Sequence, residues 1–256
     1  MPELKYIKFE KTGGVARVTL GRPKHNVMNI DMMNELNTLF EALISDNELK
    51  CLVIFGEGKS WCAGVEVGDH KPGMVVDMIS VFSRIFELID RFDVPIIAAV
   101  QGACLAGGME LAIACDIVVA SSNARFGQPE INLGFFPPYA VVRLPELVGT
   151  AKTIEICTSG KIYSAKEAAE LGFISRVVED DHFDSAVSST IEQICYNSPM
   201  IIRMNKRAVK IARGAWLASA AERVNDYFLN SLMKTEDTME GIRSFEEKRS
   251  PAWKNR

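Results

Sequence analysis

Three short, wholly apolar segments, alternating with amphipathic ones, constrain the fold of this chain most strongly. They span 52–55, 95–100 and 117–120. A strand that is apolar on both faces is typical of a parallel sheet covered on both sides. The segments 31–43 and 74–91, which precede the first two, carry apolar residues at helical spacing. This alternation predicts crossover connections and a parallel sheet, and therefore an α/β fold.

Local signals near the N-terminus predict two further elements. Gly13-Gly14 lies between two segments of strand character, 6–10 and 15–20, which predicts a β-hairpin. Asp31 stands just before the apolar residues of the first helix. An aspartate there is typical of an N-cap, so we expect Asp31 to cap that helix.

The character of the sequence changes in its second half. Ser164-Ala165-Lys166-Glu167 has the pattern of a capping box that opens a short helix, and 174–178 is typical of one more strand. From residue 181 onward nearly the whole chain has helical periodicity. We therefore predict an α/β core over 1–196 and a C-terminal helical region over 197–256, packed on the core or on a neighbouring subunit.

Composition limits the class of protein. The 256 residues are 48% hydrophobic and 24% charged, as in an average soluble domain, which excludes a disordered chain. A net charge of −4 and the lack of a basic segment interleaved with aromatic residues disfavour nucleic acid as a partner. No apolar segment approaches the roughly 20 residues of a membrane span, and the first residues lack the apolar core of a signal peptide. We expect a cytoplasmic protein that does not bind membranes.

The cysteines and histidines show neither a disulfide framework nor a metal-binding pattern. The six cysteines form no CxxC pair and mostly have apolar neighbours, which predicts reduced, buried thiols. His25, His70 and His182 share no metal-ligand spacing, so we expect no metal. Asp69 and His70 are compatible with a place in a pocket or, as is commoner for such a pair, on a loop surface.

Two segments rich in small residues are candidates for binding a ligand through the backbone. The first, 61–66, follows a predicted strand; the second, 101–112, ends a strand and opens an apolar helix at Gly107-Gly108. Small residues let a ligand approach the main chain closely, and the free N–H groups of a helix N-terminus attract negative charge. The Gly107 N–H is therefore suited to an oxyanion, although a glycine loop between strand and helix is the commoner meaning of such a segment.

Two glutamates are candidates for acid–base chemistry. Glu110 lies in the first turn of the apolar helix, and Glu130 lies between Pro129 and Ile131. A carboxylate in apolar surroundings is costly unless it has partners or a function. Taken singly, Glu110 is equally compatible with a solvent-exposed charge in a first helical turn, and Glu130 is more typical of a charge on a loop surface. Together they would form an acid–base pair if the fold brings them to one place.

Three motifs resemble those of the crotonase superfamily, the enoyl-CoA hydratase/isomerase group. They are Ala63-Gly64-Val65-Glu66, the segment 107–116 (GGMELAIACD) and the segment 126–134 (FGQPEINLG). The resemblance extends over essentially the whole chain. It implies a spiral of ββα units with a C-terminal helical region that helps to build homotrimers, often paired into homohexamers.

The resemblance also implies a function. Members bind acyl-CoA thioesters and polarise the thioester carbonyl with two backbone N–H groups, which match Val65 and Gly107 here. The first glycine of the family's three-glycine run is Ala106 in this chain. Hydratases of the family use two glutamates, which match Glu110, assigned to activating water, and Glu130, assigned to protonating carbon; the two roles are exchangeable.

The same resemblance indicates which residues lie near the coenzyme A part of the substrate and whether a separate cofactor is needed. No cofactor is expected, because coenzyme A is part of the substrate. Residues near the coenzyme are expected to be Lys24, His25, Ala63 and Gly64.

Two departures from the family bear on the substrate. The Ala-Asp that usually follows Ala-Gly is Val65-Glu66 here, followed by the segment 67–72 (VGDHKP). Where many members have a glycine-rich stretch, this chain has Phe135-Phe136-Pro137-Pro138-Tyr139. This change predicts a stiffer, bulkier wall of the acyl pocket, although it is also compatible with a neutral packing change at the start of a helix. The combination is similar to hydratases that act on a cyclic dienoyl-CoA thioester, so we expect a ring-shaped acyl group. The expected wall residues are Phe136, Pro138, Tyr139 and Val142.

Other functions stay open at this point. An isomerase or a hydrolase on the same scaffold is disfavoured by the presence of both glutamates, and a non-enzymatic relative that binds RNA or acts as a scaffold is disfavoured by the acidic charge balance. A basic helical face over 203–210 is expected to be solvated, and the methionines at positions 28, 32 and 33 are expected in the core.

Overall fold

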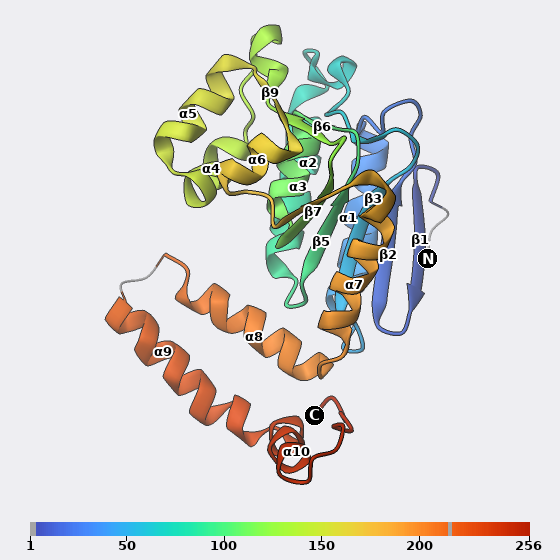
Figure 1. Ribbon diagram of the computed structural model, residues 1–256. Coiled ribbons are helices and arrows are strands. Elements are labelled where there is room, and N and C mark those ends of the chain that lie inside the picture. The colour runs from blue at the N-terminus through green and yellow to red at the C-terminus, as the bar shows by residue number, and fades with distance from the viewer. Residues whose placement is uncertain (1–3, 215–216) are drawn as a thin grey trace.

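The computed structural model, which describes residues 4–214 and 217–256, is built around a six-stranded sheet of order β1-β2-β3-β5-β7-β10 (Figure 1). The first two strands pair antiparallel and every other pair is parallel. Both the hairpin and the parallel sheet are thus confirmed. The strands are β1 (Ile7–Thr12), β2 (Val15–Leu20), β3 (Cys51–Gly56), β5 (Ile96–Val100), β7 (Ile117–Ser121) and β10 (Arg176–Val178).

A second, smaller sheet has the order β4-β6-β8-β9. Each of its first three strands follows a strand of the large sheet directly in sequence, and a helix follows each such pair. The chain therefore repeats a ββα unit, which is the spiral that the resemblance implied. The strands of the small sheet are β4 (Ser60–Cys62), β6 (Ala103–Leu105), β8 (Arg125–Gly127) and β9 (Ile162–Ser164).

Helices cover both faces of the large sheet. Alternate residues of the apolar strands pack into two separate clusters: Leu52 and Ile54 of β3 face the larger core, whereas Cys51 and Val53 face a cluster completed by the last helix of the core. Burial on both faces explains why these strands are wholly apolar. The core helices are α1 (Ile30–Ile44), α2 (Val75–Arg91), α3 (Gly107–Ala114), α4 (Ala140–Val148), α5 (Thr150–Ser159), α6 (Ala165–Leu171) and α7 (Phe183–Cys195).

Three details of these elements test the local predictions. Asp31 is not the N-cap of α1: the helix begins at Ile30, and the side chain of Asn29 accepts from the Met32 N–H at 3.1 Å. The asparagine amide oxygen thus takes the capping role, and Asp31 lies in the first turn. The capping box of Ser164 and Glu167 is confirmed at the start of α6. The methionines at positions 28, 32 and 33 are fully buried, as expected.

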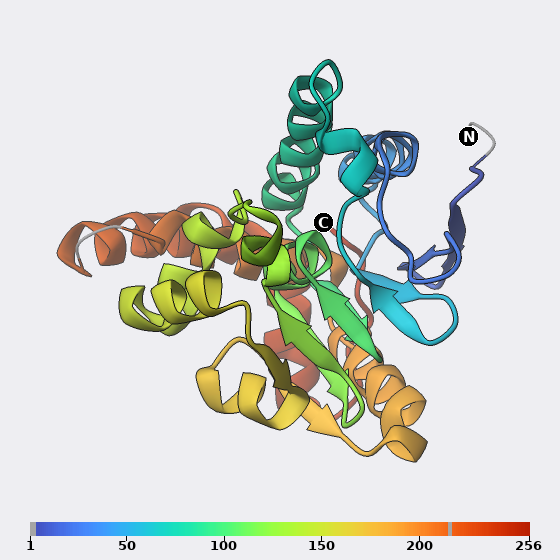
Figure 2. The ribbon, with the colours of Figure 1, turned by 90° about the horizontal axis from the view of Figure 1, so that it is seen from above.

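The C-terminal part of the chain is helical and extends below the core in Figure 1 and beyond its side in Figure 2. The boundary predicted at residue 196 stays a prediction; α7 ends at Cys195, directly before it. The helices of this part are α8 (Pro199–Ala212), α9 (Leu217–Asn230) and α10 (Glu236–Glu246).

The basic face of α8 is not merely solvated. Lys206 Nζ lies 2.6 Å from Asp116 Oδ2. Lys210 Nζ lies 3.2 Å from Asp93 Oδ1, and Arg207 contacts Oδ2 of the same carboxylate. The face expected to be solvated is thus solvated only in part, because carboxylates that are distant in sequence meet it in the folded chain. These ion pairs hold α8 against the end of the sheet.

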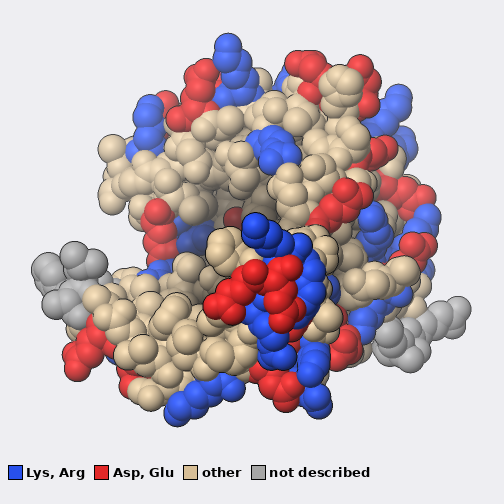
Figure 3. All heavy atoms as spheres, turned by 60° about the horizontal axis from the view of Figure 1, so that its bottom comes forward, with Lys and Arg blue, Asp and Glu red and all other residues tan. Residues whose placement is uncertain are grey.

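The surface shows no broad basic patch on the face seen in Figure 3, where basic and acidic side chains are intermingled. Within the described residues, none of the helices is both long enough and apolar enough to span a bilayer.

Candidate active site

A cavity of about 550 Å³ lies where α2, α3 and two 3₁₀ turns, η1 (Val67–His70) and η2 (Pro129–Leu133), come together. Its wall is mostly apolar, which suits an acyl group. The polar side chains on the wall belong to His70, Glu110, Glu130 and Asn132. The apolar side chains belong to Ala63, Val65, Val67, Val75, Met78, Ile79, Phe82, Ala106, Pro129, Leu133, Phe135, Phe136 and Pro138.

The two residues predicted to donate backbone N–H groups, Val65 and Gly107, both line this cavity. They are neighbours, since a Cβ atom built on Gly107 would lie 2.7 Å from Val65 Cγ2. Gly107 is the first residue of α3, where a backbone N–H has no acceptor within the helix. Across the described residues, neither N–H donates to another protein group. Two unengaged donors therefore lie side by side at the cavity.

Close backbone packing brings the two donor segments together. A Cβ atom on Gly108 would lie 2.1 Å from the Cys62 carbonyl oxygen, so only glycine lets α3 approach the end of β4 this closely. Ala106, which replaces a family glycine, adopts φ 52° and ψ −130°. A side chain is disfavoured in this conformation, so the backbone before Gly107 is strained.

Glu110 is buried, with 2% of its surface exposed, in the first turn of α3. Its Oε1 accepts from the N–H groups of Tyr139 at 2.6 Å and Ala140 at 2.8 Å, at the start of α4. The pKa of Glu110 is raised to about 8. Burial is the main cause and the negative charge of Glu130 adds to it, whereas the Ala140 and Tyr139 N–H donors oppose the shift. A carboxyl with such a pKa exchanges protons near neutral pH.

Glu130 lies in η2 and is half-buried on the same cavity wall. Burial raises its pKa to about 7. The fully buried Gln128 turns its amide NH₂ toward Glu130. In this orientation the amide nitrogen donates to Glu130 Oε1 at 2.8 Å and to Oε2 at 3.1 Å. The fold therefore brings Glu110 and Glu130 to one cavity, where their charges interact. The pKa values of both carboxyls lie near neutral pH, so each can exchange a proton there.

His70 lies on the cavity wall and not on a free loop surface. Its Nδ1 is 3.0 Å from the Glu66 carbonyl oxygen, so Nδ1 carries a proton and donates it. The ring is 4.8 Å from that of Phe135, centroid to centroid. Asp69 has a structural contact: it is buried and accepts from the Ile30 N–H at 2.9 Å.

The residues predicted near coenzyme A lie in two places. Ala63 and Gly64 line the cavity, whereas Lys24 and His25 are exposed outside it. The His25 carbonyl accepts from the Ala63 N–H at 2.9 Å, so the segment is held beside the cavity rim. Their role toward the coenzyme stays a prediction.

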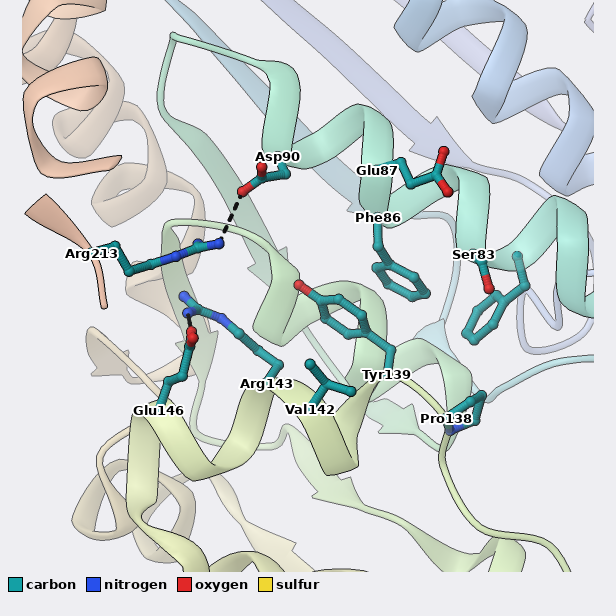
Figure 4. Close-up of a pocket in the computed structure, with 11 residues that line it drawn as sticks. Ser83, Phe86, Glu87, Asp90, Pro138, Tyr139, Val142, Arg143, Glu146 and Arg213 are labelled. Atoms are coloured by element: carbon teal, nitrogen blue, oxygen red, sulfur yellow. Dashed lines mark hydrogen bonds and ion pairs between the residues drawn. The ribbon is translucent and has the colours of Figure 1, made fainter. Parts of the chain in front are cut away.

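Two of the four residues expected in the acyl wall lie elsewhere. Phe136 and Pro138 line the cavity, but Tyr139 and Val142 line a neighbouring cavity of about 330 Å³ (Figure 4). The Tyr139 ring stacks on that of Phe86 at 3.7 Å, with the hydroxyl directed toward Arg143 and Arg213 (Figure 4). α4 begins at Ala140, and the helical turn directs these side chains away from the carboxyls.

Sequence reasoning missed the main-chain groups that hold Glu110, and it missed Gln128. Two prolines before α4 were a usable signal, because proline is typical of a helix start and free N–H groups follow there. Nothing local marked Gln128. Across the described residues, no group of three or more His, Cys, Asp or Glu side chains could hold a metal ion.

Known proteins resemble this chain over nearly its full length. The model of the enoyl-CoA hydratase/isomerase family matches residues 10–256. The chain is 32% identical to the short-chain-enoyl-CoA hydratase of Clostridium acetobutylicum, over 99% of this chain and 100% of that one. It is also 32% identical to the cyclohexa-1,5-dienecarbonyl-CoA hydratase of Thauera aromatica, over 97% and 96%.

A solved structure, the enoyl-CoA hydratase of Bacillus anthracis, is similar with a TM-score of 0.93 and 26% identity, covering 98% of this chain and 100% of that one. The matching family model, the identity to curated relatives over nearly their full length and the ββα spiral point to one conclusion. The chain belongs to the enoyl-CoA hydratase/isomerase family of the crotonase superfamily.

Proposed function

We propose that this enzyme, a hydro-lyase of the enoyl-CoA hydratase type, adds water across the α,β double bond of an acyl-CoA thioester by two-glutamate catalysis. The observation that carries the proposal is the meeting of Glu110 and Glu130 in one mostly apolar cavity with the unengaged N–H groups of Val65 and Gly107. An acid, a base and an oxyanion site are what this addition requires.

The chemistry divides among these groups as follows. As water attacks the β carbon, Glu110 takes one of its protons, and negative charge develops on the thioester oxygen. The N–H groups of Val65 and Gly107 stabilise that charge, each by about 3 kcal/mol. Glu130 then supplies a proton to the α carbon. The reactive form carries its proton on Glu130 and is the less populated one, because Glu110 has the higher pKa. The reaction leaves the proton on Glu110, and exchange with solvent restores the starting state.

The hydrogen bonds of Glu110 support its assignment as the base. Oε1 is occupied by the Tyr139 and Ala140 N–H groups, whereas Oε2 accepts from no group of the described residues. One oxygen is thus fixed and the other is available to a water molecule. No separate cofactor enters this scheme, because coenzyme A belongs to the substrate.

A cyclic dienoyl-CoA is a second candidate substrate. Phe135 and Phe136, the residues that depart from the family pattern, both lie on the cavity wall beside Pro138. Flat, rigid side chains favour a flat acyl group. The relative from Thauera aromatica acts on such a compound by its name, although its identity to this chain equals that of the short-chain enzyme.

A homotrimer or homohexamer is the assembly we propose for the chain. Apolar side chains of the C-terminal helices are exposed: Phe245 at 85%, Leu229 at 63% and Phe228 at 49%. Large apolar side chains this exposed are typical of an interface, and a second copy of the same chain is the proposed occupant. We also propose that the enzyme acts in the cytoplasm.

Steady-state assays with crotonyl-CoA and with a cyclic dienoyl-CoA test the proposed function. Loss of the enoyl absorbance with formation of the hydroxyacyl product supports hydration, and a higher kcat/KM for the ring identifies the second candidate substrate. Migration of the double bond without water uptake would identify an isomerase, and release of free coenzyme A would identify a hydrolase; either result without hydration overturns the proposal.

A further inference from the structure

Two cysteines that are 144 positions apart in sequence meet at the junction of the core and the C-terminal region. Cys51 is the first residue of β3, and Cys195 is the last residue of α7. Their sulfur atoms are 3.9 Å apart. A disulfide requires about 2 Å between the sulfurs, so a small displacement of the helix end would bring them to bonding distance.

The two thiols differ in environment, and the difference suits a reactive pair. Cys51 is fully buried, whereas Cys195 is partly exposed at the helix end. The hydrogen bond from the Cys51 thiol lowers the pKa of Cys195 to about 7; burial opposes this effect, and the charge of Lys50 adds to it. The pKa of Cys51 is raised by the same hydrogen bond and by burial, so Cys51 remains the donor.

Lys50 has a second contact with this junction. Its ammonium group donates to the Cys195 carbonyl oxygen at 2.6 Å, so the positive charge is fixed at the end of α7. A partly exposed thiolate beside a cation and a second thiol has the features of a cysteine that reacts with peroxides and is then resolved.

We propose that Cys51 and Cys195 form a modification site, a thiol pair that a hydroperoxide converts into an intramolecular disulfide. This inference is independent of the proposed function, because neither cysteine lines the cavity that holds Glu110 and Glu130.

The reaction proceeds in two steps, formation of a sulfenic acid on Cys195 and formation of the disulfide. The Cys195 thiolate attacks the terminal oxygen of the hydroperoxide, and the O–O bond breaks. The departing hydroxide, or alkoxide from an organic hydroperoxide, takes up the proton that Cys195 released. The sulfur, now a sulfenic acid, is oxidised by two electrons, and the peroxide is reduced by two. Cys51 sulfur then attacks Cys195 sulfur. The S–O bond breaks, hydroxide leaves with the Cys51 proton as water, and the S–S bond forms.

The other four cysteines provide an internal contrast. Cys62, Cys104 and Cys115 are fully buried, and burial raises the pKa of each thiol. Cys157 is also buried, and its pKa is raised by burial and by the charges of the two glutamates. Thiols of this kind are inert toward peroxide because the thiolate is the reactive form.

The test treats the reduced full-length chain with hydrogen peroxide, alkylates the remaining thiols after denaturation, and identifies linked peptides by mass spectrometry. Before alkylation, the oxidised chain should be two hydrogen atoms lighter than the reduced chain. After alkylation it should contain one disulfide, between positions 51 and 195, and four alkylated cysteines. A dithiol reductant should reverse the disulfide. The link should form at least tenfold faster than any oxidation of the other four. A link between other cysteines, a link between two chains, or no link overturns the proposal.

Single variants locate the two roles. Cys51→Ser should stop the reaction at a sulfenic acid on Cys195, which a carbon nucleophile traps, and Cys195→Ser should leave Cys51 unoxidised. Cys115→Ser, the matched control, should form the link at the wild-type rate. If Cys51→Ser does not fold, Cys195→Ser carries the test, since position 195 is partly exposed at a helix end. Equal peroxide reactivity of wild-type and Cys195→Ser chains overturns the proposal.

Discussion

The backbone N–H of Tyr139 donates a hydrogen bond of 2.6 Å to Glu110 Oε1, and this contact links helix α3 to the start of helix α4. It attaches the carboxyl of α3 to the N-terminus of α4, where main-chain donors are free. Tyr139 thus contributes to both cavities: its backbone N–H binds the Glu110 carboxyl, whereas its ring lines the neighbouring cavity of about 330 Å³ (Figure 4).

Removing the charge of either glutamate tests the acid–base pair. Glu110→Gln and Glu130→Gln should each lower kcat for hydration by about 10²–10⁴-fold, the range for general acid–base groups. The amide keeps the shape of each side chain, so circular dichroism should be unchanged. Glu10→Gln, on exposed β1, is the matched control and should retain full activity. A glutamine variant with wild-type kcat would remove that residue from the mechanism.

The raised pKa of Glu110 predicts how stability depends on pH. The pKa in the folded chain, about 8, exceeds the ordinary value of 4.5, so the folded state binds a proton that the unfolded state releases between these values. Glu110 therefore makes the protein less stable as the pH rises through this window. Glu110→Gln should raise Tm relative to wild type at pH 9 but change it little at pH 4. A Tm difference independent of pH would contradict a buried, protonated Glu110.

Strain at Ala106 predicts a stabilising substitution. Its φ of 52° and ψ of −130° suit glycine, and relief of such strain is worth about 1–3 kcal/mol, reduced by the extra freedom of glycine in the unfolded chain. Ala106→Gly should raise the free energy of unfolding by about 1 kcal/mol in urea titrations. A loss of stability would show that the side chain contributes packing that outweighs the strain.

Gly108 should tolerate no side chain. A Cβ there would lie 2.1 Å from the Cys62 carbonyl oxygen, so Gly108→Ala must separate α3 from β4. We expect a loss of at least about 2 kcal/mol of stability, as in overpacked cores, together with most of the activity. Gly68→Ala is the control, because its Cβ would meet nothing closer than 3.9 Å. Comparable stability of the two variants would show that the segments are not in close contact.

The two cavities predict different effects for two apolar residues. Phe136→Ala removes part of the acyl wall and should lower kcat/KM for hydration by about tenfold, mostly through KM, since burying such a side chain against a ligand is worth about 1–3 kcal/mol. Val142→Ala, in the neighbouring cavity, should change kcat/KM less than about threefold. The reverse order in a crotonyl-CoA assay would place the acyl group in the other cavity.

The sequence by itself determined the elements and most of the chemistry. The apolar strands required a sheet buried on both faces. The motifs around Val65, Gly107, Glu110 and Glu130 carried the family resemblance, and that resemblance implied the groups of the site. These features are visible because they depend on residue types at fixed spacing within one segment.

Only the tertiary structure decided what meets across segments. Local periodicity did not reveal that the Tyr139 N–H holds Glu110 while its ring lies in another cavity, that the basic face of α8 pairs with Asp93 and Asp116, or that Cys51 approaches Cys195. Each of these contacts joins residues at least 29 positions apart. Whether such residues meet depends on how the helices and strands that carry them pack together. The residue types on either side of each position in the sequence carry no information about that packing.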